Sequence, residues 1–197
     1  MNNGQGMMEF PDHPFWDFAI DVYRRPGVSD ACLKLQEPYH LDVNLLLFCG
    51  WTGAFGMGRL SNEEIALCRD AVAGWHDNVV RALRGVRRLL KDGFTDLPAE
   101  LGEISGALRK QIQAREIDAE HLEQLILVGM VHRVPNDHIG TAEKFADAAA
   151  NMAAYCRALD ARFDESDRAS LTIILAAMFP DQADQAARRM IDAAARA

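Results

Sequence analysis

The sequence predicts an all-α fold, a compact bundle of about eight or nine helices around a buried central helix at about residues 42–54. Apolar residues recur at helical spacing along most of the chain, and no alternating run of β-branched residues indicates a strand. In the segment 41–55, LDVNLLLFCGWTGAF, almost no polar side chain follows Asn44. A helix that is apolar on all sides is buried on all sides, and this one is shorter than the roughly 20 residues that span a bilayer.

Composition places the chain among ordinary globular proteins, with 49% hydrophobic and 25% charged residues in a length of 197. Its net charge of −8 gives no overall attraction to nucleic acid or to anionic lipid, so we expect neither as a partner. No signal peptide or transmembrane segment is apparent, which favours the cytoplasm. The cysteines lie in apolar helical patterns without metal-binding spacing and are predicted to be reduced core residues: Cys32, Cys49, Cys68 and Cys156.

Residues 10–133 are predicted to form a helical core domain, preceded by a disordered segment at residues 1–9. Asp12 is expected to cap the first helix and Ser29 the second, which Pro38 ends. The expected helices of this domain are residues 14–25, 29–37, 42–54, 62–92, 98–115 and 119–133.

The C-terminal part, residues 141–197, is rich in alanine and follows a linker at residues 134–140, VPNDHIG. We expect it to be a helical extension that packs on the core domain or belongs to a single domain with it. Its alanine-rich helices could also pair between two chains, so a homodimer is left open. Met190 and Ile191 are expected to face inward. The expected helices are residues 141–161, 171–179 and 181–195.

Three N-terminal segments resemble a bacterial family of small uncharacterised proteins that is known only as a domain of unknown function. They are FWDFAIDVYRRPGV at residues 15–28, ACLKLQ at 31–36 and LDVNLLLF at 41–48. Later positions that resemble the same family are Trp75, Val79, Val80, Leu83, Arg84, Arg87, Arg88, Lys91, Glu120, Glu123 and Gln124. The resemblance spans roughly residues 13–128 and implies a bacterial, intracellular, helical protein without indicating an activity.

The helix at residues 62–92 carries both an apolar stripe and a basic stripe. Its inward-facing residues recur at steps of three and four: Ile65, Cys68, Val72, Trp75, Val79, Leu83, Val86 and Leu90. Largely opposite lie Arg81, Arg84, Arg88 and Lys91, with Arg87 nearby. This basic face could bind an acidic partner. Alternatively, it is a solvated face with internal ion pairs, such as one to Asp77.

Asp42 and Asn44 are the polar beginning of the otherwise apolar central helix. Together with Trp16 and Trp51 as walls, they could form a pocket for a small molecule. The simpler interpretation is that Asp42 is the N-cap of the helix and that Asn44 makes a buried hydrogen bond to a neighbouring helix.

No metal site and no cofactor are predicted. The best available set of metal-ligating side chains lacks the spacing of a known motif and is explained as a solvated surface: Glu116, Glu120, His121, Glu123, His132 and His138. Gly53, Gly56 and Gly58 follow a helix rather than a strand, which favours a turn over a phosphate-binding loop. No catalytic motif is recognisable, so the sequence favours a protein without enzymatic activity over an enzyme.

The leading functional hypothesis is therefore a non-enzymatic interaction or adaptor protein of the bacterial cytoplasm. It would bind an unidentified acidic protein partner through the basic face of Arg81, Arg84, Arg88 and Lys91. The alternative is a small-molecule-binding protein or enzyme whose pocket lies at the beginning of the central helix.

Overall fold

The computed structural model describes residues 9–94, 97–160, 162–182 and 184–194. Within these ranges the chain forms α-helices and one short π-helical segment, without a strand, which confirms the predicted all-α fold. Of residues 1–9, which the sequence predicts to be disordered, residues 1–8 lie outside the described residues, and Glu9 is described without regular secondary structure. The helices are α1 (Pro14–Tyr23), α2 (Val28–Tyr39), α3 (Val43–Ala54), α4 (Asn62–Trp75), the π-helical segment η1 (His76–Val80), α5 (Arg81–Asp92), α6 (Ala99–Met130), α7 (Thr141–Ala158), α8 (Glu165–Met178) and α9 (Asp184–Ala194).

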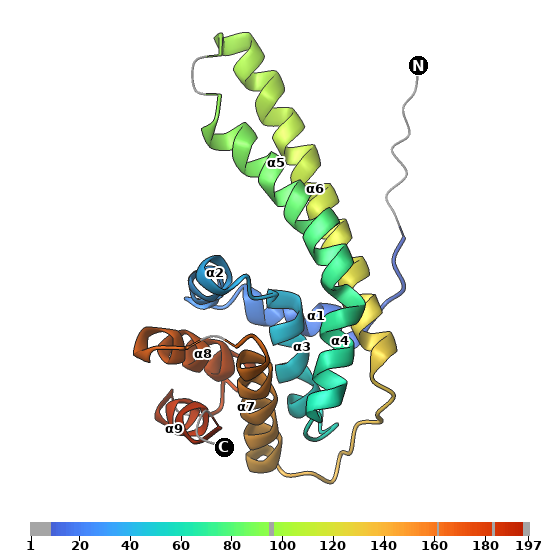
Figure 1. The fold of residues 1–197 in the computed structure, drawn as a ribbon, viewed down its shortest axis with the longest axis vertical. Helices are drawn as coiled ribbons and strands as arrows, with labels where there is room; N and C mark the ends of the chain where they lie inside the picture. Colours follow the sequence, from blue (N-terminus) through green and yellow to red (C-terminus); the bar gives the residue numbers. More distant parts are fainter. Residues whose placement is uncertain (1–8, 95–96, 161, 183, 195–197) are drawn as a thin grey trace.

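Helix α3 lies at the centre of the molecule, where α1, α6, α7 and α8 pack around it (Figure 1). Residues 44–53 of this helix are all buried, as expected for a helix that is apolar on all sides. The approach of α7 to α3 depends on Gly53, because a Cβ atom at this position would lie 2.2 Å from the backbone nitrogen of Ala148. A glycine therefore sets the distance between the two helices.

Helices α4, η1 and α5 follow one another without a break and run alongside α6 (Figure 1). The far parts of α5 and α6 project from the body of the molecule as a two-helix arm (Figure 1). The sequence predicted two helices at 98–115 and 119–133, but α6 is a single helix. Neither glycine nor proline separates Arg115 from Ala119, and Asp118 forms an ion pair with Arg115 at 2.7 Å within the helix instead of capping a new one.

Several predicted helix boundaries also need correction. Helix α2 begins one residue before Ser29, after Gly27 in the left-handed conformation (φ 81°), and includes Pro38 in its last turn. The side chain that caps α1 belongs to His13 rather than Asp12, because its Nδ1 accepts a hydrogen bond from the backbone N–H of Phe15. Helix α8 begins at Glu165 rather than at residue 171. Its N-cap, Asp164, forms a reciprocal capping box with Asp167.

The C-terminal helices share the hydrophobic core with the N-terminal ones. Helix α7 lies along α3, α8 packs on α2, and α9 packs on α7 and α8 (Figure 1). Phe145 and Met152 from α7 are fully buried in this core, as is Ile191 from α9, while the side chain of Met190 lies outside the described side chains. Among the described residues, none of the helices combines the length and apolar character needed to cross a membrane.

Candidate functional site

The buried face of α4 continues into the π-helical segment with other residues than the sequence predicted. The predicted apolar stripe continued from Val72 to Trp75 and Val79, but the buried residues after Val72 are His76 and Val80. A π-turn accommodates one extra residue, so the residues that follow are rotated by about 100° from the α-helical register. Arg84 follows the segment and is turned by it, whereas His76 begins the segment four residues after Val72 and points into the protein on the ordinary α-helical face.

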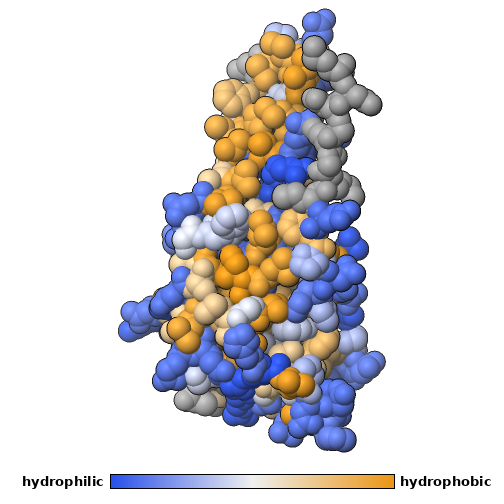
Figure 2. All heavy atoms as spheres, turned by 90° about the vertical axis from the view of Figure 1, so that its right-hand side faces the viewer, coloured by the Kyte–Doolittle hydropathy of each residue, from blue (hydrophilic) through white to orange (hydrophobic). Residues whose placement is uncertain are grey.

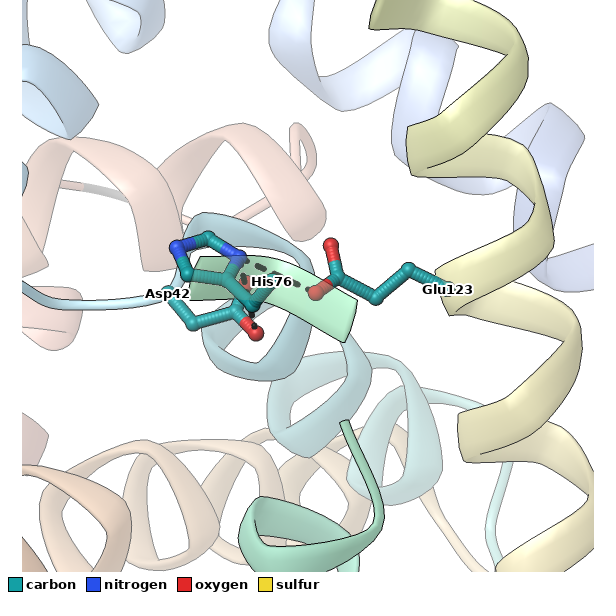
Figure 3. Close-up of side chains that lie close together, drawn as sticks. All are labelled: Asp42, His76 and Glu123. Atoms are coloured by element: carbon teal, nitrogen blue, oxygen red, sulfur yellow. Dashed lines mark hydrogen bonds and ion pairs between the residues drawn. The ribbon is translucent and has the colours of Figure 1, made fainter. Parts of the chain in front are cut away.

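Asp42, His76 and Glu123 meet in the interior from three segments that lie far apart in the sequence (Figure 3). His76 Nδ1 lies 3.0 Å from Glu123 Oε1 and 3.5 Å from Asp42 Oδ2. The side chains of Asp42 and His76 are 9% and 8% exposed, and that of Glu123 is fully buried. Two carboxylates and an imidazole thus converge within one small, buried volume, which we call the Asp-His-Glu cluster.

Hydrogen bonds from neighbouring groups orient this cluster. Asp42 is the N-cap of α3, and its Oδ1 accepts hydrogen bonds from the backbone N–H groups of Asn44 and Leu45 at 2.8 and 3.2 Å. Glu123 Oε2 accepts a hydrogen bond of 2.6 Å from Asn44 Nδ2, while Asn44 Oδ1 accepts one of 2.9 Å from Gln124 Nε2. Because a carboxylate oxygen can only accept, this chain of bonds fixes both amide orientations and turns Gln124 Oε1 away from Asn44.

The electrostatics of the cluster favour bound protons. Burial, together with the charge of Glu123, raises the pKa of Asp42 to about 7. Burial alone would lower the pKa of His76, but its hydrogen bond to Glu123 and the charge of Asp42 outweigh this effect and raise the pKa. The cluster can therefore hold and exchange a proton near neutral pH.

A cavity of about 420 Å³ adjoins the cluster between α1, α2, α3, α5 and α6. Both Asp42 and His76 line it. Its apolar wall consists of Trp16, Ala19, Ile20, Tyr23, Leu33, Val43, Leu47 and Ile117. Its other lining residues are polar or charged: Arg24, Gln36, Asn44, Arg84, Arg87, Arg88, Gln113, Glu116, Glu120 and Gln124.

Three buried polar atoms of the lining residues have no hydrogen-bond partner among the described residues: Asp42 Oδ2, Arg84 Nη1 and Gln124 Oε1. Native interiors rarely leave such groups unpaired, since each one costs about 1–3 kcal/mol. All three belong to residues that line one cavity, although each atom has less than 1 Å² of accessible surface, so contact with a further molecule requires a small side-chain shift.

The predicted pocket residues are divided between this cavity and the core. Trp16, Asp42 and Asn44 line the cavity. Trp51 lies elsewhere, in an aromatic group with Phe15, Phe48 and Phe55, where the ring centroids are 5.2 to 5.8 Å apart. The predicted cap is confirmed, because Asp42 Oδ1 caps α3, while Oδ2 lies 3.5 Å from His76 Nδ1 without a hydrogen-bond partner among the described residues.

The predicted basic face is largely paired within the chain. Arg84 donates to Glu116 at 2.9 Å and to Glu120 at 2.7 Å across the contact between α5 and α6. Arg87 also binds Glu116, Arg88 binds Glu37, and Arg81 binds Asp77 at 2.9 Å. Lys91 is exposed near the outer end of α5. These partners compete with any acidic protein for the same guanidinium groups.

The best metal-ligating set in the sequence is not brought together. Glu116 and Glu120 bind arginines, while His132 and His138 are exposed on the segment before α7. His121 stacks between Phe10 and Trp16, with ring-centroid distances of 4.2 and 3.8 Å. Of these six predicted residues, Glu123 is the one that belongs to the Asp-His-Glu cluster. Sequence reasoning missed His76 because its partner Glu123 is 47 residues away and no local spacing connects them.

The comparisons with known proteins agree with the expected resemblance. No curated protein and no solved structure matches the chain. A family described as "Protein of unknown function (DUF2390)" matches residues 14–127, a range that contains the Asp-His-Glu cluster and every residue lining the cavity. Because this match covers more than half of the 197 residues, the chain belongs to this family of unknown function.

Proposed function

We propose that this protein binds a small polar molecule in the cavity between α1, α2, α3, α5 and α6. The observation that carries the proposal is the presence of three unpaired, buried polar atoms on residues lining that cavity: Asp42 Oδ2, Arg84 Nη1 and Gln124 Oε1. A ligand that pairs with them recovers the cost of leaving them without partners. The cavity volume of about 420 Å³ lies within the range of sites for metabolites.

The unpaired atoms indicate the chemistry of the ligand. Asp42 Oδ2 and Gln124 Oε1 are acceptors and require a hydrogen-bond donor, whereas Arg84 Nη1 is a charged donor that suits a carboxylate or phosphate. The indole of Trp16 and the side chain of Leu47 offer apolar surface for the rest of the molecule. We therefore expect a ligand that combines an anionic group, a hydrogen-bond donor and a short apolar part.

Native mass spectrometry of the purified protein tests this proposal. We expect an additional mass, larger than that of a metal ion, that disappears on denaturation. Ile20 lines the cavity, so the variant Ile20→Trp should fill the cavity and abolish the additional mass. Leu67 is 57% exposed on α4 and does not line the cavity, which makes Leu67→Trp the matched control. Retention of the mass in Ile20→Trp, or its absence from the wild type after incubation with a metabolite extract, would contradict the proposal.

A second candidate function is self-association through the two-helix arm. Hydrophobic side chains cover much of the upper part of Figure 2, which corresponds to this arm. They are about 40–65% exposed and belong to both α5 and α6 and the segment joining them: Val86, Leu89, Phe94, Leu97, Leu101, Ile104 and Leu108. Contiguous apolar surface of this kind marks an interaction site. Because both helices of the arm carry this apolar surface, the arm of a second copy could pack against it to form a four-helix bundle with two-fold symmetry.

Light scattering after size-exclusion chromatography tests this association. The expected mass is twice 21.9 kDa for the wild type and 21.9 kDa for the double variant Leu89→Lys, Ile104→Lys. Leu67→Lys on α4 is the control for an added charge on an exposed apolar position. A wild-type mass of 21.9 kDa at high protein concentration would remove this candidate.

A further inference from the structure

We propose that Asp42, His76 and Glu123 bind a divalent transition-metal ion at the inner wall of the cavity. This inference goes beyond binding of an organic molecule; it shares the atom Asp42 Oδ2 with the proposed function, and the experiments below distinguish the failure of one from the failure of the other. It follows from the geometry, the burial and the hydrogen bonding of the three side chains (Figure 3).

The separations of the donor atoms suit a shared ion. Asp42 Oδ2, His76 Nδ1 and Glu123 Oε1 all lie within 4.8 Å of one another, with individual distances to Nδ1 of 3.5 and 3.0 Å. Ligand atoms around a tetrahedral ion with bonds of about 2.05 Å lie about 3.3 Å apart. Small side-chain adjustments therefore place all three atoms in contact with one ion, using the neutral imidazole that has its proton on Nε2.

The charge of the cluster also calls for a cation. Two carboxylates lie side by side in the interior, where an uncompensated negative charge is costly. Asp42 Oδ2 provides an independent observation, because its side chain is nine-tenths buried and this oxygen has no hydrogen-bond partner among the described residues. A divalent ion would neutralise both carboxylates and use the free oxygen as a ligand.

The groups behind the two carboxylates are arranged as in metal sites. Asp42 Oδ1 is held by two backbone N–H groups, which leaves Oδ2 to face His76. Asn44 Nδ2 holds Glu123 Oε2, which leaves Oε1 to face the same nitrogen. Hydrogen bonds that fix the far oxygen of each ligating carboxylate orient the near one toward the ion.

The donor set restricts the identity of the ion. One imidazole nitrogen and two carboxylate oxygens suit Zn²⁺, Mn²⁺, Fe²⁺ or Co²⁺ better than Mg²⁺ or Ca²⁺, which prefer oxygen ligands alone. Three protein ligands leave at least one coordination position open, as in catalytic rather than structural zinc sites. Asp42 and His76 line the cavity, so the open position would be accessible from it. An ion there and Arg84 would both attract the anionic group of a ligand.

Isothermal titration of the chelator-treated full-length protein with ZnCl₂ and MnCl₂ tests the proposal. We expect one ion per chain. Asp42→Asn and Glu123→Gln keep the cap of α3 and the bond to Asn44, and each should weaken binding by more than about 100-fold. Asp147→Asn is the matched control, because Asp147 is a buried carboxylate that pairs with Arg59 outside the cluster. Circular dichroism checks that each variant is folded.

A spectroscopic measurement on the wild type avoids any dependence on the variants. Co²⁺ bound by imidazole and carboxylate ligands should produce visible absorption bands that ZnCl₂ abolishes by displacement. No bands and no heat of binding, or unchanged binding in Asp42→Asn and Glu123→Gln, would overturn the metal site and leave a proton shared within the cluster.

These experiments separate the metal site from the organic ligand. Ile20→Trp should keep its affinity for Zn²⁺ while losing the additional organic mass. A protein that retains a metabolite but binds no ion would overturn the metal site alone, whereas one that binds a single ion but no metabolite would support the metal site and contradict the proposed function.

Discussion

At the scale of single residues, Glu116 and Glu120 lie one turn apart on α6, yet their pKa values shift in opposite directions. Burial favours the protonated form of Glu116, but hydrogen bonds from Arg87 and Arg84 outweigh burial and lower its pKa. Burial dominates at Glu120 and raises its pKa in spite of the nearby Arg84. The two side chains therefore contribute to the pH dependence of stability with opposite signs.

We predict that Glu116→Gln reduces the free energy of unfolding by about 1–3 kcal/mol at pH 7, because it removes charge-assisted hydrogen bonds. A lowered pKa in the folded state provides stability above the unfolded-state value of about 4.5, and this stability is lost as the pH falls through the folded-state value. The difference between wild type and variant should therefore shrink below about pH 4.5. Urea unfolding across this range measures it.

Glu120→Gln is the control for the sign of this effect. Since the pKa of Glu120 is raised, the wild-type carboxyl contributes most stability below about pH 4.5 and loses it as the pH rises through the folded-state value. The slope of the difference curve should be opposite to that of Glu116→Gln. Parallel curves for the two variants would show that the arginines do not distinguish between the two carboxylates.

At the scale of elements, the packing of α7 on α3 depends on the absence of a side chain at Gly53. Its neighbour is the backbone of Ala148, which cannot move aside as a flexible side chain can. Gly74 in α4 is the opposite case, because a Cβ atom there would meet nothing within 4 Å. The two helical glycines therefore differ in whether tertiary packing requires them.

We predict that Gly53→Ala destabilises the protein by about 3 kcal/mol or more, since α7 has to move away from the central helix. Gly74→Ala should stabilise it by about 0.5–1 kcal/mol, because alanine restricts the unfolded chain and favours the helix. Thermal unfolding of both variants measures the contrast. A Gly53→Ala variant as stable as the wild type would show that the contact of α3 with α7 is looser than the distances indicate.

The sequence revealed the buried central helix and the cap at Asp42 because both are local: one is a run of apolar residues and the other a polar residue immediately before that run. It did not reveal the π-helical segment, because no residue type in HDNVV signals an additional residue in a helical turn. The direction of Arg84 depended on that segment, whereas the meeting of His76 with Glu123 depended on the packing of α4 and η1 against α6. Side chains that meet only through tertiary structure leave no periodic signal in a single sequence.

At the scale of the whole molecule, the C-terminal helices support the site as well as the core. Tyr155 from α7 is fully buried, and its hydroxyl accepts a hydrogen bond of 3.0 Å from the backbone N–H of Asp42. Met152 from the same helix is fully buried near Gly50 of α3. The segment beyond the family match therefore covers one side of the central helix and holds the residue that begins it.

We predict that a chain ending at residue 140 does not fold cooperatively, because removal of α7–α9 exposes the apolar face of α3 to water. The comparison of this fragment with the full chain by heat-induced unfolding and by amide NMR dispersion measures the effect. Addition of the separate peptide 141–197 should restore structure to the fragment. A fragment that unfolds with the same sharp transition as the full chain would identify residues 141–197 as an independent extension.

The π-helical segment between Val72 and Arg84 has a further consequence for relatives of this protein. The additional residue in this stretch sets the angle about the helix axis between His76, which faces Asp42 and Glu123, and Arg84, which faces Glu116. Removal of a single residue there would restore a regular helix and turn one of these groups away, even if every functional side chain were retained. In an alignment of homologues, the stretch that joins α4 to α5 should therefore be free of gaps wherever Asp42, His76 and Glu123 are all present. The number of residues, as much as their identity, then distinguishes members that possess the site from members that have lost it.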